Sequence, residues 1–418
     1  MNFNFIKSEF IRNSATLVSG NSVAQILPIA VAPILTRLYT PSELGIFALF
    51  LSTTQFISTI SCGGFEYAIP VSKDENEALK VATVSIIISL FLNIFIFILS
   101  LVLIPYLQGT LVDQNLSWFY FAPVGAFMIS AYNIFNYKAL KQKGYKKIAF
   151  SNILKSVFRS IIDLGLGLVK LGYTGLITGL IISYIVGTHI LLRKTNFNLR
   201  TALNIKVSDF KKIVTQFNNF PKYYLPGLAL NNASLHLPNY FISNLYGTTA
   251  LGFYSYGFRI LSMPLMLIGK SISDAYFEMG STYKNSGKSL KNLYNQTFIK
   301  LAIIAIPLFF LFSFVVEDVF TFVFGQDWIV AGRYCKIILP LLCVRLISRP
   351  LSMTFLILDK QRTLMIWQLC LLIFTIASFA IAVVYNKSIE QYLLLFTLLL
   401  TFHYLFLILL GKFISSKS

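Results

Sequence analysis

Long apolar runs recur from one end of the chain to the other, and they decide which kind of element the sequence predicts. A stretch such as Val84–Leu103 is apolar on every face, whereas a membrane β-strand alternates polar and apolar residues over about ten positions. A helix rises about 1.5 Å per residue, so about 20 apolar residues cross a hydrocarbon core about 30 Å thick. The pattern therefore predicts membrane-spanning helices.

The runs predict twelve spans, which fall into two sets of six. The first set is Asn13–Leu38, Leu44–Ile69, Val81–Leu103, Ser117–Tyr137, Ile148–Val169 and Thr174–Leu192. The second set is Tyr223–Leu245, Leu251–Ser271, Thr297–Phe324, Val330–Leu358, Met365–Tyr385 and Ile389–Gly411. The fold class expected is an all-α integral membrane protein with about 12 transmembrane helices in two six-helix lobes.

The charge distribution orients these spans. Hydrophobic residues make up 56% of the chain and charged residues only 12%, against about 25% charged in a soluble domain. Of the 35 Lys and Arg residues, 25 lie in the two tails and alternate connections, three in the opposite connections and seven inside spans. Basic loops stay in the cytoplasm during insertion, so both termini are expected there. The net charge of +19 thus reflects topology and attraction to anionic lipid, and nucleic-acid binding is not expected.

Several classes of chemistry have no matching motif. The four cysteines (Cys62, Cys335, Cys343 and Cys370) lack CxxC spacing, and the three histidines are isolated in the sequence. Neither a metal nor a cofactor is expected. The sequence contains no GxxxxGK[ST] loop for nucleotide hydrolysis. The first apolar segment is longer than the core of a cleavable signal peptide, so we expect it to be retained.

The longest connection divides the chain into a lobe at 1–200, a cytoplasmic linker at 201–222 and a second lobe at 223–418. Leu38-Tyr39, four residues and Leu44-Gly45 recur as Leu245-Tyr246, four residues and Leu251-Gly252. Each copy joins the first two spans of its half. Since both halves begin on the same side, the match predicts a parallel repeat about an axis along the membrane normal.

Prolines occupy the first span of each half. The first span carries Pro28 and Pro33, and the seventh carries Pro226 and Pro238. Proline removes a backbone donor and kinks a helix, and interrupted helices at matching places in two repeats indicate a transport pathway. The alternative is that these prolines only reflect the higher frequency of proline in membrane helices.

Seven basic residues lie within the predicted spans: Lys155, Arg159, Arg259, Arg333, Lys336, Arg345 and Arg349. A cation at the bilayer centre costs at least about 2.5 kcal/mol, so it faces a partner or a wet cavity. Lys155, Arg159 and Asp163 share one helix face at i, i+4 and i+8, so Arg159 and Asp163 could pair while Lys155, Arg333 and Lys336 extend toward the membrane surfaces.

That pairing leaves Arg259, Arg345 and Arg349 without enough intramembrane acids. The excess favours an anionic passenger, and the planar donors of arginine suit phosphate. The predicted anion cradle consists of Arg159, Arg259, Arg345, Arg349, Lys155 and Lys336. Asp163 and Glu66 are the acids placed deeply enough to couple a cation or proton.

Three motifs resemble the Wzx-type polysaccharide flippases of the MATE-like (MOP) transporter superfamily. They are Leu35–Gly45 at the first outer hairpin, Phe324–Trp328 followed by Ala331, and Gly63–Ile69. The resemblance implies a transporter of the bacterial cytoplasmic (inner) membrane. Its passenger would be an undecaprenyl-diphosphate-linked oligosaccharide repeat unit for O-antigen, lipopolysaccharide or capsule-like assembly. Alternating access would occur without ATP hydrolysis, beside other polysaccharide-assembly membrane proteins.

Two other functions are considered. An ion-coupled exporter of drug-like cations has the same fold, but a cationic cavity opposes its passenger. A membrane-embedded glycosyltransferase or ligase needs an outer domain for its acceptor chemistry, and the longest predicted outer connection, Tyr106–Leu116, has eleven residues. An enzymatic function is therefore not expected.

Overall fold

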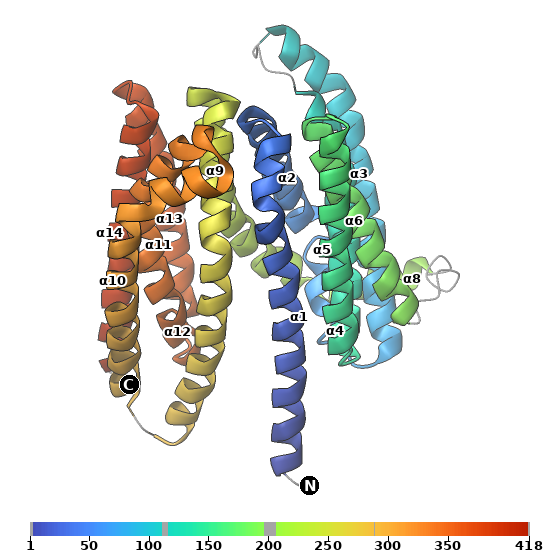
Figure 1. Ribbon diagram of the computed structural model, residues 1–418. Coiled ribbons are helices and arrows are strands. Elements are labelled where there is room, and N and C mark those ends of the chain that lie inside the picture. Colours follow the sequence, from blue (N-terminus) through green and yellow to red (C-terminus); the bar gives the residue numbers. More distant parts are fainter. Residues whose placement is uncertain (1–2, 111–115, 196–205, 288, 417–418) are drawn as a thin grey trace. The chain divides into compact units, whose positions relative to one another are not determined.

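The computed structural model describes residues 3–110, 116–195, 206–287 and 289–416, and these are helical almost throughout (Figure 1). Strands are absent from these ranges. The chain divides into two compact units, Met1–Asn232 and Ala233–Ser418. The prediction of an all-helical membrane protein is confirmed.

The first unit contains seven α-helices and three shorter helical turns among its described residues. Its elements are α1 (Phe3–Leu38), α2 (Pro41–Ser61), η1 (Phe65–Ala68), α3 (Glu75–Thr110), η2 (Ser117–Phe121), α4 (Ala122–Lys141), α5 (Tyr145–Leu168), α6 (Tyr173–Lys194), α8 (Val207–Gln216), the π-helical turn η3 (Phe220–Tyr224) and the start of α9 (Leu225–Asn285). In this unit α5 packs between α1 and α6, and α4 contacts α2, α3 and α6.

The second unit contains the rest of α9 and the elements that follow it. These are α10 (Leu290–Phe324), η4 (Gln326–Trp328), α11 (Ile329–Leu351), α12 (Met353–Ile357), α13 (Gln361–Val384) and α14 (Ile389–Ser416). Helix α11 packs against α10 and α14, and it buries thirteen of its 23 residues. It is therefore the central helix of this unit.

Eight described helices are long and apolar enough to cross a bilayer, and the difference from twelve predicted spans has physical causes. Helix α9 carries two predicted spans, because only Gly247 (φ 84°) departs from helical geometry at the predicted hairpin. Helices α5 and α11 carry charged residues along most of their length, so they are not among the eight. The apolar part of α1, Ser22–Leu38, is shorter than the 18 residues that a span needs.

Two predicted spans were too long. The helix of the second span ends at Ser61, because Gly63 and Gly64 adopt positive φ (61° and 78°) and η1 follows them. The tenth predicted span is two helices, since α11 ends at Leu351 and α12 begins at Met353. Helix α8, which lies in the predicted linker, was not predicted from the sequence.

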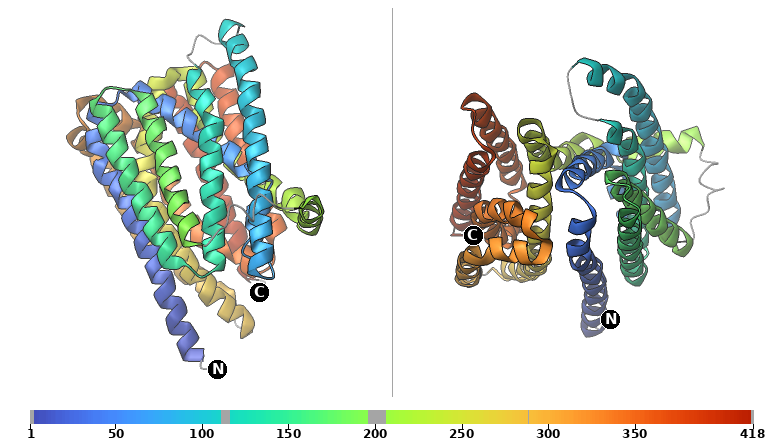
Figure 2. Two further views of the ribbon diagram at one scale, coloured as in Figure 1. Left: turned by 90° about the vertical axis from the view of Figure 1, so that its right-hand side faces the viewer. Right: turned by 45° about the horizontal axis from the view of Figure 1, so that its top comes forward.

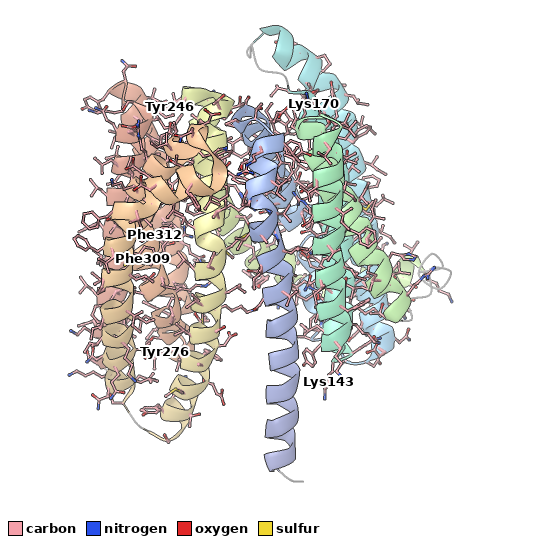
Figure 3. All side chains as sticks on the ribbon, viewed as in Figure 1. Lys143, Lys170, Tyr246, Tyr276, Phe309 and Phe312 are labelled. Carbon is pink, nitrogen blue, oxygen red and sulfur yellow. The ribbon has the colours of Figure 1, made fainter. Side chains whose placement is uncertain are left out.

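Exposed apolar side chains identify the lipid-facing surfaces. In α3, Phe91 is 78% exposed, and in α10, Phe322 is 88% exposed. Only 17% of the most apolar stretch of α3 is buried within the protein. A soluble protein would rarely expose such continuous apolar faces, so lipid covers them. Lys143 and Lys170, which flank α5, lie at opposite ends of the first unit (Figure 3).

The repeated hairpins make matching contacts in the two units. The Tyr39 hydroxyl donates to the backbone oxygen of Asp163 in α5 (2.6 Å), and the Tyr246 hydroxyl donates to that of Lys387, just after α13 (3.0 Å). Helices α5 and α13 are the fifth helices of their halves, and each is followed by a residue of positive φ, Lys170 (60°) and Asn386 (45°). The shared geometry extends the sequence match to the ends of the fifth helices.

Candidate functional site

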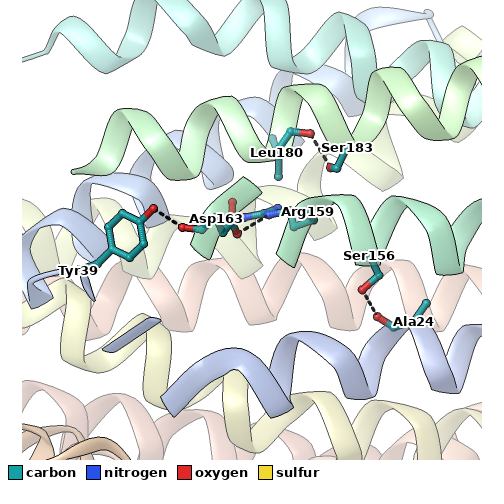
Figure 4. A network of polar contacts seen from close by, with 7 residues as sticks. All are labelled: Ala24, Tyr39, Ser156, Arg159, Asp163, Leu180 and Ser183. Carbon is teal, nitrogen blue, oxygen red and sulfur yellow. Dashed lines mark hydrogen bonds and ion pairs between the residues drawn. The ribbon is translucent and has the colours of Figure 1, made fainter. Parts of the chain in front are cut away.

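Arg159 and Asp163 lie side by side on one face of α5 (Figure 4). The Arg159 Nε donates to the Asp163 Oδ2 at 3.0 Å, and the two side chains are 15% and 6% exposed. Gly179 of α6 lies so close to Asp163 that an added Cβ would overlap the carboxylate. The Arg159 guanidinium also lies 5.0 Å from the centre of the Phe47 ring. The ion pair expected from the i, i+4 spacing is present.

Lys155, one turn before Arg159, is held by aromatic rings. Its Nζ lies 3.9 Å from the centre of the Tyr132 ring in α4 and 4.4 Å from that of Tyr184 in α6. The face of an aromatic ring attracts a cation without neutralising it. These two rings lie on helices other than α5, so the spacing within α5 could not predict them.

Two arginines of α11 lie one turn apart in the second unit. The Arg345 guanidinium lies 5.9 Å from the Phe258 ring centre and 5.6 Å from that of Tyr404. Arg349 is exposed, and Gly269 of α9 leaves room for its side chain. No carboxylate of the described residues lies within 4.0 Å of either guanidinium. Arg259 follows Phe258 in α9 and is partly buried.

The cations near the start of α11 have an acidic partner. The Lys336 Nζ donates to the Glu317 Oε1 at 2.8 Å, and the Arg333 Nε lies 3.9 Å from the Glu317 Oε2. Both basic side chains are about half exposed. Lys336, predicted for the anion cradle, therefore has a carboxylate that offsets its charge.

Glu66 is buried in η1 at the end of α2, with 4% of its surface exposed. Its Oε2 has no hydrogen-bond partner among the described residues. The Cys62 thiol contacts the Glu66 side chain, and the Tyr67 ring packs against those of Tyr137 and Tyr224. Glu66 is therefore a buried acid of the first unit, and its role in ion coupling stays a prediction.

The predicted helix breaks occupy different positions within their helices. Pro28 and Pro33 lie inside α1, and the Thr36 hydroxyl donates to the Pro33 carbonyl at 3.0 Å. Pro238 lies inside α9, whereas Pro226 is the second residue of α9, directly after the π-helical turn η3. Groups of three or more His, Cys, Asp or Glu side chains that could hold a metal are absent from the described residues.

The fold is that of known transporters. The structure is similar to an inward-facing multidrug resistance MATE family transporter of the MOP superfamily, with a TM-score of 0.64, 16% identity, and 96% of this chain and 94% of that chain covered. The outward-facing form of such a transporter gives a TM-score of 0.62, 16% identity, and coverage of 97% and 94%. A MOP superfamily transporter from Pyrococcus furiosus, whose pocket of reverse polarity suggests a different function, gives 0.61, 16%, 97% and 95%.

Sequence comparison supplies the family. No curated protein matches the chain, but the model of a family described as "Polysaccharide biosynthesis protein" matches residues 34–332. All three motifs that suggested a Wzx-type flippase lie inside this range, and the resemblance is confirmed. The family and the fold are those of transporters and not of enzymes. The chain is a multi-pass membrane protein that belongs to the polysaccharide biosynthesis family and has the MATE-like fold of the MOP superfamily.

Proposed function

We propose that the chain moves a polyprenyl-diphosphate-linked oligosaccharide from the inner to the outer leaflet of the bacterial cytoplasmic membrane. The family supports a role in polysaccharide assembly, and the fold supports transport. The observation that carries the choice of an anionic passenger is the pair Arg345 and Arg349. Their guanidinium groups lack a carboxylate within 4.0 Å among the described residues, and arginine binds phosphate through two parallel hydrogen bonds.

The diphosphate would bind Arg345 and Arg349 in the second lobe, with Arg259 on α9 as a further donor. In the first lobe, Lys155 and Arg159 are proposed as further basic residues of the substrate pathway. The polyprenyl tail would stay in the lipid bilayer, because the tail is itself apolar. Alternating access between the two six-helix lobes would need no nucleotide, and the termini would lie in the cytoplasm.

Asp163 and Glu66 are the proposed sites for a coupling proton or cation. Asp163 already neutralises Arg159, so a proton on Asp163 would release that guanidinium. Glu66 has an oxygen without a hydrogen-bond partner among the described residues. A drug-like cation, the passenger of the alternative exporter, would be repelled by the two arginines of α11.

The test is export of surface glycan by cells that carry single substitutions. Arg345→Ala and Arg349→Ala should abolish export while the protein inserts at normal levels. Arg345→Lys and Arg349→Lys should restore it in part, because lysine returns the charge without the planar donors. Arg333→Ala is the matched control, since this arginine lies on the same helix beside Glu317. Normal export by both alanine variants would refute the anion cradle.

A further inference from the structure

An apolar groove follows the outer face of α3 and ends beneath α8. Its walls are Ile87, Ile88, Phe91, Leu92 and Phe95 of α3 and Phe210 of α8, and its volume is about 520 Å³. The five α3 residues are spaced i, i+1, i+4, i+5 and i+8, so they form one strip along the helix axis. The strip is about 12 Å long at about 1.5 Å per residue. A long, narrow apolar strip suits an extended hydrocarbon chain.

Helix α8 closes one end of this groove because polar contacts fix it to the start of α3. The Lys80 Nζ donates to the Asp209 Oδ1 at 3.0 Å, and the Gln216 Nε2 donates to the Glu77 Oε1 at 2.8 Å. Ile213 is buried beneath α8 against the first-unit core. Helix α8 therefore lies across α3 and not along it (Figure 2).

The exposed side of α8 is basic. Lys211 and Lys212 are exposed, and neither has an ion pair among the described residues. The one acid of this helix, Asp209, is already paired with Lys80. A short helix with apolar residues on one face and lysines on the other has the composition of an interfacial membrane helix.

We propose that the α3–α8 groove binds an anionic phospholipid of the bilayer. One acyl chain lies on the strip from Ile87 to Phe95 under Phe210, and the phosphate lies against Lys211 and Lys212. The site differs from the proposed anion cradle in residues and ligand, and it does not depend on what is transported. Its effect would be to fix α8 at the cytoplasmic membrane surface.

Position and charge favour a bilayer lipid as the occupant. The exposed α3 surface around the groove is apolar, with Phe91 78% and Phe95 57% exposed, so acyl chains already surround it. Lys211 and Lys212 lie within one turn of Asp209, which pairs with Lys80 near the start of α3, and lysines near a membrane surface attract anionic lipid. Transmembrane helices pack closely on small residues, whereas the strip consists of Ile, Leu and Phe side chains.

The test counts lipids that the purified full-length chain retains from nanodiscs of phosphatidylglycerol and phosphatidylcholine, by native mass spectrometry. The wild type should retain phosphatidylglycerol selectively. Lys211→Gln with Lys212→Gln should weaken this retention about thirtyfold, which is about 2 kcal/mol for two lysines at the surface. Leu92→Trp, which fills the groove and keeps the lysines, should weaken it similarly.

The matched control is Lys143→Gln with Lys146→Gln, which removes the same charge from two exposed positions, one between α4 and α5 and one in the first turn of α5. It should retain the lipid as the wild type does. Equal losses in the control and the α8 variant would show that only surface charge is involved, and the site would be rejected. Unchanged retention by Leu92→Trp would reject the groove. Displacement of phosphatidylglycerol by an equal amount of polyprenyl diphosphate would show that the occupant is the transported lipid, and this would also overturn the proposal.

Discussion

The ion pair between Arg159 and Asp163 offers a test that separates folding from transport. Asp163→Ala would leave the Arg159 guanidinium, which is 15% exposed, without its carboxylate. Removing one partner of a buried pair costs about 3–5 kcal/mol. The Phe47 ring, 5.0 Å from the guanidinium, still stabilises the cation by about 1 kcal/mol. We therefore expect a loss near the lower limit, about 3 kcal/mol.

The matched variant replaces both charges by apolar side chains of similar size, Arg159→Met with Asp163→Leu. Such replacements of buried pairs are often neutral or stabilising. Unfolding of the purified protein in detergent, followed by heat or denaturant, would measure both effects. The single variant should unfold far more easily than the wild type, and the double variant should not. Equal stability of the two variants would refute the ion-pair reasoning.

Glycan export by the same variants then tests the role of Arg159. If Arg159 binds the passenger, the double variant should fold normally and export poorly. Normal export by a stable double variant would remove Arg159 from the proposed cradle. The pair would then have a structural role that holds α5 against α6.

Three further predictions concern topology, packing and pH. A reporter fused after Lys141 should be active only in the cytoplasm and one after Lys170 only outside, and the reverse pattern would refute the orientation. Gly179→Ala should lower the thermal stability, because its Cβ would overlap the Asp163 carboxylate, whereas Gly165→Ala, with open space around it, should not. The hydrogen bond from Lys284 lowers the pKa of Asp359. The small stabilisation by this exposed pair should therefore be present above the ordinary pKa of the carboxyl group and disappear as the pH falls through the lowered one, and Asp359→Asn should show no such change.

The length of the apolar runs predicted most of the fold, because a helix needs about 20 residues to cross the bilayer. The predicted hairpin at Tyr246–Leu251 coincides with the non-helical Gly247. Helix α8 was not predicted because, with ten residues and three charges, it is too short and too polar to be recognised as a span. Its apolar residues Phe210, Ile213 and Val214, with Phe217 directly after it, pack against the first-unit core, and this packing is visible only in the structure.

The partners of the intramembrane cations could be predicted only where they share a helix. The pair Arg159–Asp163 followed from i, i+4 spacing. The rings around Lys155 belong to Tyr132 and Tyr184 on other helices, and Glu317 reaches Lys336 from α10. Contacts between helices depend on rotation about each helix axis, which a single sequence does not determine.

The kind of partner decides which cations can serve an anionic passenger. A carboxylate neutralises a cation, whereas an aromatic ring lowers the cost of burying it and leaves its charge in place. Arg345 lies against the rings of Phe258 and Tyr404 with no carboxylate of the described residues within 4.0 Å, whereas Lys336 is paired with Glu317. Neutral substitution should therefore reduce glycan export strongly at Arg345 (to Gln) and weakly at Lys336 (to Gln with Glu317→Gln), at equal protein levels. If the second variant lost export as completely as the first, the type of partner would not predict function, and the cradle would have to include the outer end of α11.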